Sequence, residues 1–194
     1  MRFRITITGT APMLMHNGRL ADPLDPATQA LKALTDKRKK TDDDLIDIAR
    51  AEFLGGLYID PDVGPYIPGE NIERAIVDGA KLTRNGANVK RGLFIETDVN
   101  PLVYNGPRTA EAIWEDENFR LTRTVVNPGT SRRVSRTRPI FNGWATEAEG
   151  TLDESVLDFR TLAAIVEQAG AYVGLGDWRP RYGRFTAELE KTAE

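Results

Sequence analysis

Hydrophobic and polar residues alternate at the start of the chain, and this pattern predicts a half-buried β-strand over residues 2–8. Phe3, Ile5 and Ile7 would share one face of that strand, while the residues between them are polar. Further strands are expected over residues 57–59, 93–95, 102–104, 146–152 and 184–189. Strands are therefore predicted along the whole chain, including both of its ends.

Apolar residues spaced by three or four positions predict the helices. Asp25 would cap a helix that opens at Pro26 and reaches residue 35. A second helix would open at Thr41, with three aspartates in its first turn, and stop at Gly55-Gly56. Its expected buried residues are Leu45, Ile48, Ala49 and Phe53. Other helices are expected from residue 72 to about 84, over 109–115 and over 159–172.

The order of these elements predicts an α+β fold, in which helices cover an antiparallel sheet. A ferredoxin-like βαββαβ core, as in the RAMP and RRM folds, is its simplest form. At 194 residues, the chain is expected to form a single domain over residues 1–194. Residues 18–56 would be a helical insertion, and residues 119–141 would form a projecting, basic β-hairpin.

Composition narrows the class of protein. The chain is 40% hydrophobic and 28% charged, which is typical of a soluble globular protein and excludes disordered and collagen-like classes. No apolar run approaches the roughly 20 residues of a membrane span, and the N-terminus lacks the apolar core of a signal peptide. The absence of cysteine excludes disulfides and cysteine zinc sites. We therefore expect a cytoplasmic protein with no membrane partner.

The formal net charge is only −3, so the distribution of charge matters more than its sum. No acidic residue occurs between Asn118 and Gly143. The same segment holds Arg120, Arg123, Arg132, Arg133, Arg136 and Arg138. On the returning strand of the predicted hairpin, Arg132, Arg136 and Arg138 would share a face that follows a nucleic-acid backbone. A solvated basic face, paired with acidic helices elsewhere, would explain the segment equally well.

Residues 174–184 form a second candidate for binding nucleic acid. They combine three glycines, which let a ligand approach the main chain, with three arginines, which match phosphate geometry. Trp178 and Tyr182 offer ring faces on which a base could stack. The alternative is a glycine-rich turn with Trp178 packed and the arginines solvated. The predicted nucleic-acid-binding residues are Arg132, Arg133, Arg136, Arg138, Gly174, Gly176, Trp178, Arg179, Arg181, Tyr182 and Arg184.

Three segments occur in an order that resembles a known family. They are the opening strand with residues 10–14, the Pro-Gly segment over residues 65–72, and the glycine-rich loop over residues 174–184. Together they resemble the RAMP superfamily, the ferredoxin-like RNA-binding subunits of CRISPR complexes. Residues 19–24 and 176–181 also resemble strings in uncharacterised bacteriophage proteins, which would place the chain in the host cytoplasm.

The resemblance implies a protein that binds single-stranded RNA or DNA and assembles along it as a homo-oligomer. It also implies that the arginine hairpin acts as a thumb or finger on the strand. The sequence departs from the family in its helical insertion and in Asp177-Trp178, where the family prefers glycine and small residues. These departures argue against guide-RNA binding specifically and leave nucleic-acid binding in general open.

Few residues of the sequence indicate catalysis. His16 is the single histidine and a candidate general acid or base, and Asp60 is a candidate for metal-dependent cleavage. The chain has no Walker loop, and its Gly174-Leu175-Gly176 string follows a helix rather than the strand of a dinucleotide site. We expect neither a cofactor nor a bound metal. The leading prediction is a non-catalytic nucleic-acid-binding protein. The alternatives are a metal- or histidine-dependent ribonuclease, and a phage structural or host-interaction (counter-defence) protein that binds no nucleic acid.

Overall fold

A computed structural model describes residues 1–126, 129, 131 and 133–192 of the chain. Contacts between residues divide the chain into two compact units. Unit 1 comprises Met1–Leu14, Ile59–Gly106 and Phe141–Glu194, and unit 2 comprises Met15–Tyr58 and Pro107–Ile140. The segment expected as a helical insertion and nearly all of the expected arginine hairpin therefore lie together in unit 2.

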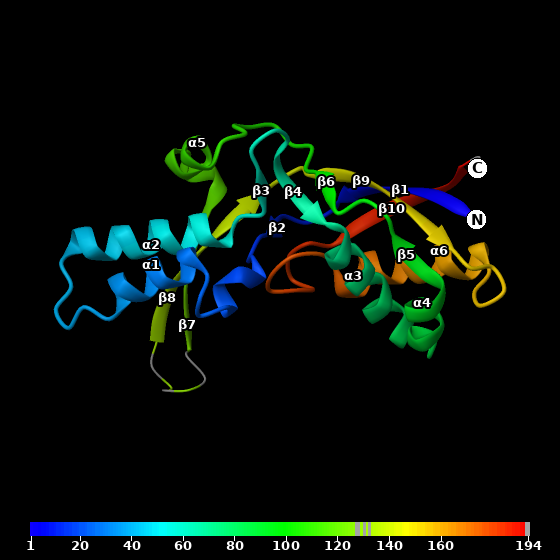
Figure 1. The fold of residues 1–194 in the computed structure, drawn as a ribbon, viewed down its shortest axis with the longest axis horizontal. Coiled ribbons are helices and arrows are strands. Elements are labelled where there is room, and N and C mark those ends of the chain that lie inside the picture. Colours follow the sequence, from blue (N-terminus) through cyan, green and yellow to red (C-terminus); the bar gives the residue numbers. More distant parts are fainter. Residues whose placement is uncertain (127–128, 130, 132, 193–194) are drawn as a thin grey trace. The chain divides into compact units, whose positions relative to one another are not determined.

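Unit 1 is built on a four-stranded antiparallel sheet with the strand order β10-β1-β9-β5 (Figure 1). Its strands are β1 (Arg2–Gly9), β5 (Leu93–Ile95), β9 (Ala145–Leu152) and β10 (Phe185–Thr192). The helix α3 (Gly69–Lys81) lies between β1 and β5 in the chain, and α6 (Phe159–Gln168) lies between β9 and β10. This βαββαβ sequence confirms the predicted α+β, ferredoxin-like fold.

The core of unit 1 follows the alternation of the strands. Phe3, Ile5 and Ile7 of β1 are buried, as their spacing predicts. The helix α3 and the segment that follows α6 approach each other closely at Gly79. A Cβ atom on Gly79 would lie only 2.7 Å from the Cβ of Ala169. Ala169 opens a short π-helical turn (Ala169–Val173) that extends α6. The helix predicted over residues 159–172 is thus present, with a wider last turn.

A smaller sheet in unit 1 has the order β3-β4-β6, and its strands differ from the prediction. They are β3 (Ile59–Asp60), β4 (Gly64–Pro68) and β6 (Val99–Pro101). The strand expected over residues 102–104 is replaced by a single bridge at Val103. The strand β6 lies earlier in the chain and contains Asn100, a buried polar residue whose amide donates to the carbonyls of Ile67 (2.9 Å) and Thr97 (2.8 Å). Unit 1 also contains β2 (Met13–Leu14) and the unpredicted α4 (Gly86–Gly92).

Unit 2 contains three helices and most of the arginine hairpin. The helices are α1 (Pro26–Thr35), α2 (Asp42–Gly56) and α5 (Ala110–Glu115), and the strands are β7 (Arg120–Val126) and β8 (Arg133–Phe141). Two short 3-10 helices cover Gly18–Ala21 and Glu117–Phe119. The predicted caps are present: Asp25 accepts from the Ala27 amide at 2.8 Å, and Thr41 and Asp44 form a reciprocal capping box.

The start of α2 is held by charge. A hydrogen bond from the Lys37 ammonium, together with one from the Thr41 amide, lowers the pKa of Asp44 to about 2.

The prediction that Leu45 of α2 is buried is wrong, because this residue is 54% exposed. Burial in α2 is confined to its C-terminal part, where Glu52 and Phe53 lie. The first turns of this helix are therefore exposed despite their apolar residues.

Candidate nucleic-acid interface

The glycine-rich loop over residues 174–184 is held in shape by backbone hydrogen bonds within unit 1. The Leu175 amide donates to the Gly183 carbonyl, and the Gly183 amide donates to the Pro12 carbonyl, both at 2.8 Å. Gly174, Gly176 and Gly183 have φ angles between 75° and 80°. A Cβ atom on Gly183 would collide with the Leu175 carbonyl oxygen. The glycines thus serve the closure of the loop.

Two aromatic side chains of this loop lie side by side. The ring centroids of Trp178 and Tyr182 are 6.2 Å apart, with an angle of 56° between the ring planes. The Tyr182 amide donates to the Trp178 carbonyl, and the Trp178 amide donates to the Asp177 carboxylate at 3.0 Å. Both residues are half-buried, so part of each ring is accessible. The loop thus offers aromatic surface in a defined orientation.

The three arginines of the loop have different surroundings. Arg179 donates to the Gly174 carbonyl at 3.2 Å, and its guanidinium lies 3.8 Å from the Asp78 carboxylate of α3. Arg181 and Arg184 are exposed, and within the described part of the chain neither side chain has an ion-pair partner. Arg179 therefore braces the loop, whereas Arg181 and Arg184 are available to an anion.

Asp78 also binds cations of its own helix. Partial burial of its carboxylate raises its pKa, but hydrogen bonds from Lys81 and Arg74 outweigh burial and leave the pKa below its usual value. The group is thus an anion already matched by neighbours at 2.6 and 3.0 Å. Arg179 adds a third, longer contact, which makes it a weaker tie than the backbone hydrogen bonds of the loop.

In unit 2, two arginines of the hairpin bind a buried carboxylate. Glu52 of α2 contacts the guanidinium groups of Arg138 at 2.9 Å and Arg136 at 3.2 Å. It also accepts a hydrogen bond from the Thr137 amide at 2.8 Å. The side chain of Arg138 is only 8% exposed. Of the expected solvent-facing row, Arg138 is thus directed into unit 2, whereas Arg136 pairs with Glu52 and keeps 37% of its side chain exposed.

The other arginines of the hairpin are placed differently. Arg123 and Arg133 are exposed, and no partner of either side chain occurs among residues 1–126, 129, 131 and 133–192. The guanidinium of Arg120 lies 4.7 Å from the Trp114 ring centroid and pairs with Glu117 at 3.3 Å. Arg132, the remaining predicted binding residue, lies outside the described residues. The sequence pattern did not single out Trp114 or Glu52.

The two weak catalytic candidates belong to different units. Asp60 of unit 1 accepts hydrogen bonds from the amides of Asp62 (2.9 Å) and Val63 (3.2 Å), the geometry of an Asx turn. His16 of unit 2 is exposed. Among the described residues, no three histidine, cysteine or acidic side chains gather in an arrangement that could hold a metal ion. The structure thus gives Asp60 a turn-forming role.

The open face of the unit 1 sheet has the wrong charge for a polyanion. Arg4 of β1 lies between Glu149 and Glu190 in the strand register and pairs with Glu149 at 3.3 Å. Thr6, two residues on, lies between Glu147 and Glu188. A strand of nucleic acid is therefore expected to avoid this face.

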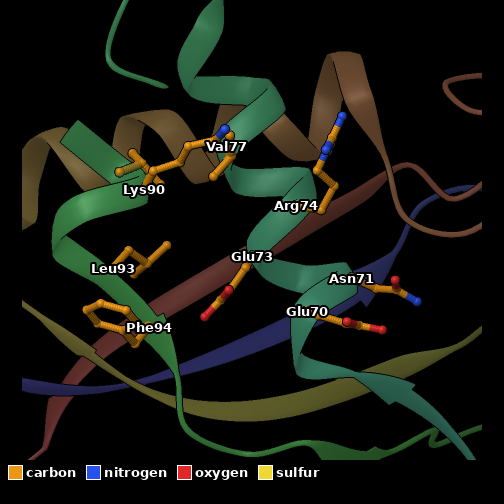
Figure 2. A pocket seen from close by; sticks show the side chains of 9 residues that line it. Glu70, Asn71, Glu73, Arg74, Val77, Lys90, Leu93 and Phe94 are labelled. Carbon is orange, nitrogen blue, oxygen red and sulfur yellow. The ribbon is translucent and has the colours of Figure 1, made fainter. Parts of the chain in front are cut away.

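A hollow of about 430 Å³ in unit 1 lies between α3, α4 and β5 (Figure 2). Figure 2 shows Glu73 directed toward Leu93 and Phe94, whereas Glu70 and Asn71 point away from them. The Glu73 carboxylate accepts from the Ile95 amide at 2.7 Å and so joins α3 to β5. The charged lining residues are two acids and two bases: Glu70, Glu73, Arg74 and Lys90. This balance gives the hollow no preference for phosphate.

A helix that crosses a bilayer needs about 20 predominantly apolar residues. Within the part of the chain that the structure describes, none combines the length and apolar character needed to cross a membrane.

No family model matches the chain, and no curated protein matches it.

Comparisons of structure find likeness in fold. A chain in the cryo-EM structure of the Type III-B Cmr-beta bound to cognate target RNA matches with a TM-score of 0.51 and 12% sequence identity. The match covers 98% of the present chain and 58% of that chain, so the present chain spans less than two thirds of its neighbour. A chain of a Type IV-B CRISPR complex aligns over 100% of the present chain and 92% of its own length, with 12% identity and a TM-score of 0.44. The first match agrees with the α+β, ferredoxin-like fold that the sequence predicted.

Proposed function

We propose that the chain is a non-catalytic protein that binds single-stranded nucleic acid through the glycine-rich loop of unit 1. One observation carries this proposal. Arg181 and Arg184 are exposed, have no ion-pair partner among the residues that the structure describes, and lie on a loop whose backbone is fixed by hydrogen bonds. A fixed loop loses little conformational entropy when a strand binds. The loop is thus preorganised for binding.

Each part of the loop has a role in this proposal. Arg181 and Arg184 bind phosphate, for which the guanidinium fork is well matched. Trp178 and Tyr182 stack on bases, an interaction worth about 1–3 kcal/mol per base. Arg179 positions the loop through Gly174 rather than contacting the strand. RNA is favoured over DNA because the fold neighbour is a chain of a Cmr-beta structure bound to cognate target RNA.

The hairpin of unit 2 supplies a second, separate basic surface in this proposal. Its exposed arginines are Arg123 and Arg133, and Arg132 belongs to the same predicted set. Arg136 and Arg138 are assigned to Glu52 and leave the binding set. We further propose that several copies line up along one long strand. The origin of the chain in a bacteriophage stays a prediction.

The loop is tested by replacing both of its exposed arginines. Arg181→Ala with Arg184→Ala should weaken binding of a fluorescent oligouridine at least tenfold in anisotropy titrations, because each charge-assisted contact is worth about 1.5–3 kcal/mol. Arg2→Ala with Arg160→Ala removes the same charge from exposed positions elsewhere in unit 1 and should leave affinity nearly unchanged. An unchanged melting temperature in both variants would separate binding from folding.

Two results would contradict this assignment. Equal losses in the loop variant and in the control would mean that only net charge matters. No binding of RNA or DNA by the unmodified chain, even at low salt, would overturn nucleic-acid binding altogether. The second result would favour the protein-interaction alternative, which the acidic open face of the unit 1 sheet supports.

A further inference from the structure

A hollow of about 460 Å³ in unit 2 lies beside the arginine hairpin. Its wall includes Ile46 and Ala49 of α2, Trp114 of α5, and Arg120, Thr122 and Arg123 of β7. The volume is within the range of small-ligand pockets in proteins. Unlike the hollow in unit 1, it contains an indole ring and an excess of basic over acidic side chains.

Trp114 forms a fixed aromatic wall of this pocket. Its ring meets Phe53 edge-on, with centroids 5.2 Å apart and an angle of 65°. On the ring itself lies the Arg120 guanidinium, 4.7 Å from the centroid. Trp114 is half-buried, so packing holds the ring while part of it stays accessible. A flat ligand would find a rigid surface of stacked indole and guanidinium groups.

The two arginines of the pocket are available to bind a phosphate. Arg120 pairs with Glu117, but the Glu117 side chain is 91% exposed, and such surface ion pairs contribute little. Arg123 is exposed and has no partner in the described ranges of the chain. A phosphate could therefore bind both arginines without the loss of a strong internal interaction.

Apolar and hydroxyl groups complete the pocket. Ile46 is 58% exposed and provides apolar surface at the hollow. The hydroxyl groups of Thr122 and Thr137 are 2.9 Å apart and also line the hollow. These groups fit the apolar face and polar edge of a nucleobase.

We infer that this pocket binds a single nucleotide unit, with its base against Trp114 and Ile46 and its phosphate on Arg120 and Arg123. The inference rests on the proposed function, because it names where unit 2 would hold one nucleotide of a bound strand. A nucleotide of a strand and a free nucleoside monophosphate share this chemistry. The site is distinct from the glycine-rich loop, which belongs to unit 1.

Tryptophan fluorescence tests this inference. The chain has three tryptophans, so Trp178→Phe leaves only Trp114 and the buried Trp144. In that background, uridine or adenosine monophosphate and an oligouridine should quench the emission. Arg123→Ala should weaken the nucleotide affinity measured by quenching about tenfold and leave the melting temperature unchanged. Arg123→Lys should restore part of the affinity. Arg50→Ala, an exposed arginine of α2, is the matched control and should have no effect.

The arms of the experiment separate this inference from the proposed function. Binding of the oligonucleotide by the unmodified chain in anisotropy titrations, without quenching of Trp114 in the Trp178→Phe background, would overturn the pocket and leave the loop intact. Quenching of Trp114 by the mononucleotide, without any binding of the oligonucleotide by the unmodified chain, would support the pocket as a site for free nucleotides and overturn strand binding. Quenching that Arg123→Ala and Arg50→Ala reduce equally would overturn the assignment of Arg123 to the phosphate.

Discussion

Glu52 is a single residue that pairs with two arginines of the hairpin and accounts for the burial of one of them, Arg138. Its side chain is 6% exposed and contacts Arg136, Arg138 and the Thr137 amide. A carboxylate can be buried in this way only when cations and hydrogen bonds replace its water. The same contacts fasten the β8 strand to α2. Glu52 therefore links the charge of the hairpin to the stability of unit 2.

Glu52→Gln tests this role. The substitution leaves the Arg138 guanidinium buried beside a neutral group, which should lower the free energy of unfolding by about 3 kcal/mol, the usual cost of breaking a buried pair. Urea denaturation would measure the change. Glu111→Gln, at an exposed position of α5, should stay within about 0.5 kcal/mol of the unmodified chain. Equal stability of the two variants would mean that Arg138 does not depend on Glu52.

At the scale of an element, the glycine-rich loop shows how a backbone conformation supports a binding surface. Its closure depends on the hydrogen bond between the Leu175 amide and the Gly183 carbonyl, where Gly183 has a φ of 75°. Any Cβ atom there meets both an unfavourable φ and the Leu175 carbonyl oxygen. The orientation of Arg181 and Arg184 thus depends on a residue without a side chain.

Gly183→Ala should therefore disturb the loop and with it the binding of nucleic acid. We expect a loss of about 2 kcal/mol or more in unfolding free energy, because strain at a positive φ adds to the collision. Gly143→Ala is the control: Gly143 has a φ of 56°, but no atom lies within 4 Å of an added Cβ. The control should lose only the unfolding free energy that comes from strain at the positive φ, and its oligouridine affinity should be unchanged. Retained affinity in Gly183→Ala would show that loop closure is not needed for binding.

The whole molecule is acidic, with a formal net charge of −3, so its surfaces must attract a polyanion locally. In unit 1 the open face of the sheet is rich in glutamate, whereas the loop carries Arg181 and Arg184. In unit 2 the exposed cations of the hairpin include Arg123 and Arg133. Binding should thus depend on a small number of phosphate contacts and respond moderately to salt.

Titrations across salt concentration measure that number. If Arg123, Arg133, Arg181 and Arg184 each neutralise one phosphate, the slope of log affinity against log salt should be about −3 for a single strand. Removal of Arg181 and Arg184 should reduce the magnitude of the slope by about 1.4. A slope near zero would show that phosphate contacts do not drive binding. A slope that is unchanged in the double variant would place the contacts elsewhere.

Much of the fold could be predicted because its signals are local. The alternation of Phe3, Ile5 and Ile7 predicted β1, and the caps at Asp25 and Thr41 predicted the starts of α1 and α2. The prediction failed where a distant partner overrides the local pattern. Asn100 is a buried polar residue in a strand, where it donates to the Ile67 carbonyl, and Leu45 is 54% exposed although its spacing in α2 predicts burial.

The sequence by itself determined most of the elements, the βαββαβ order and the concentration of arginine in two segments. These properties depend on residues a few positions apart, where spacing and capping act. Only the tertiary structure decided which arginines are available to a ligand. Glu52 and Arg138 are far apart in the chain, and burial makes their pairing obligatory. In the same way, folding brought Trp114 beside Arg120 and Arg123, because a pocket is defined by what surrounds it in space.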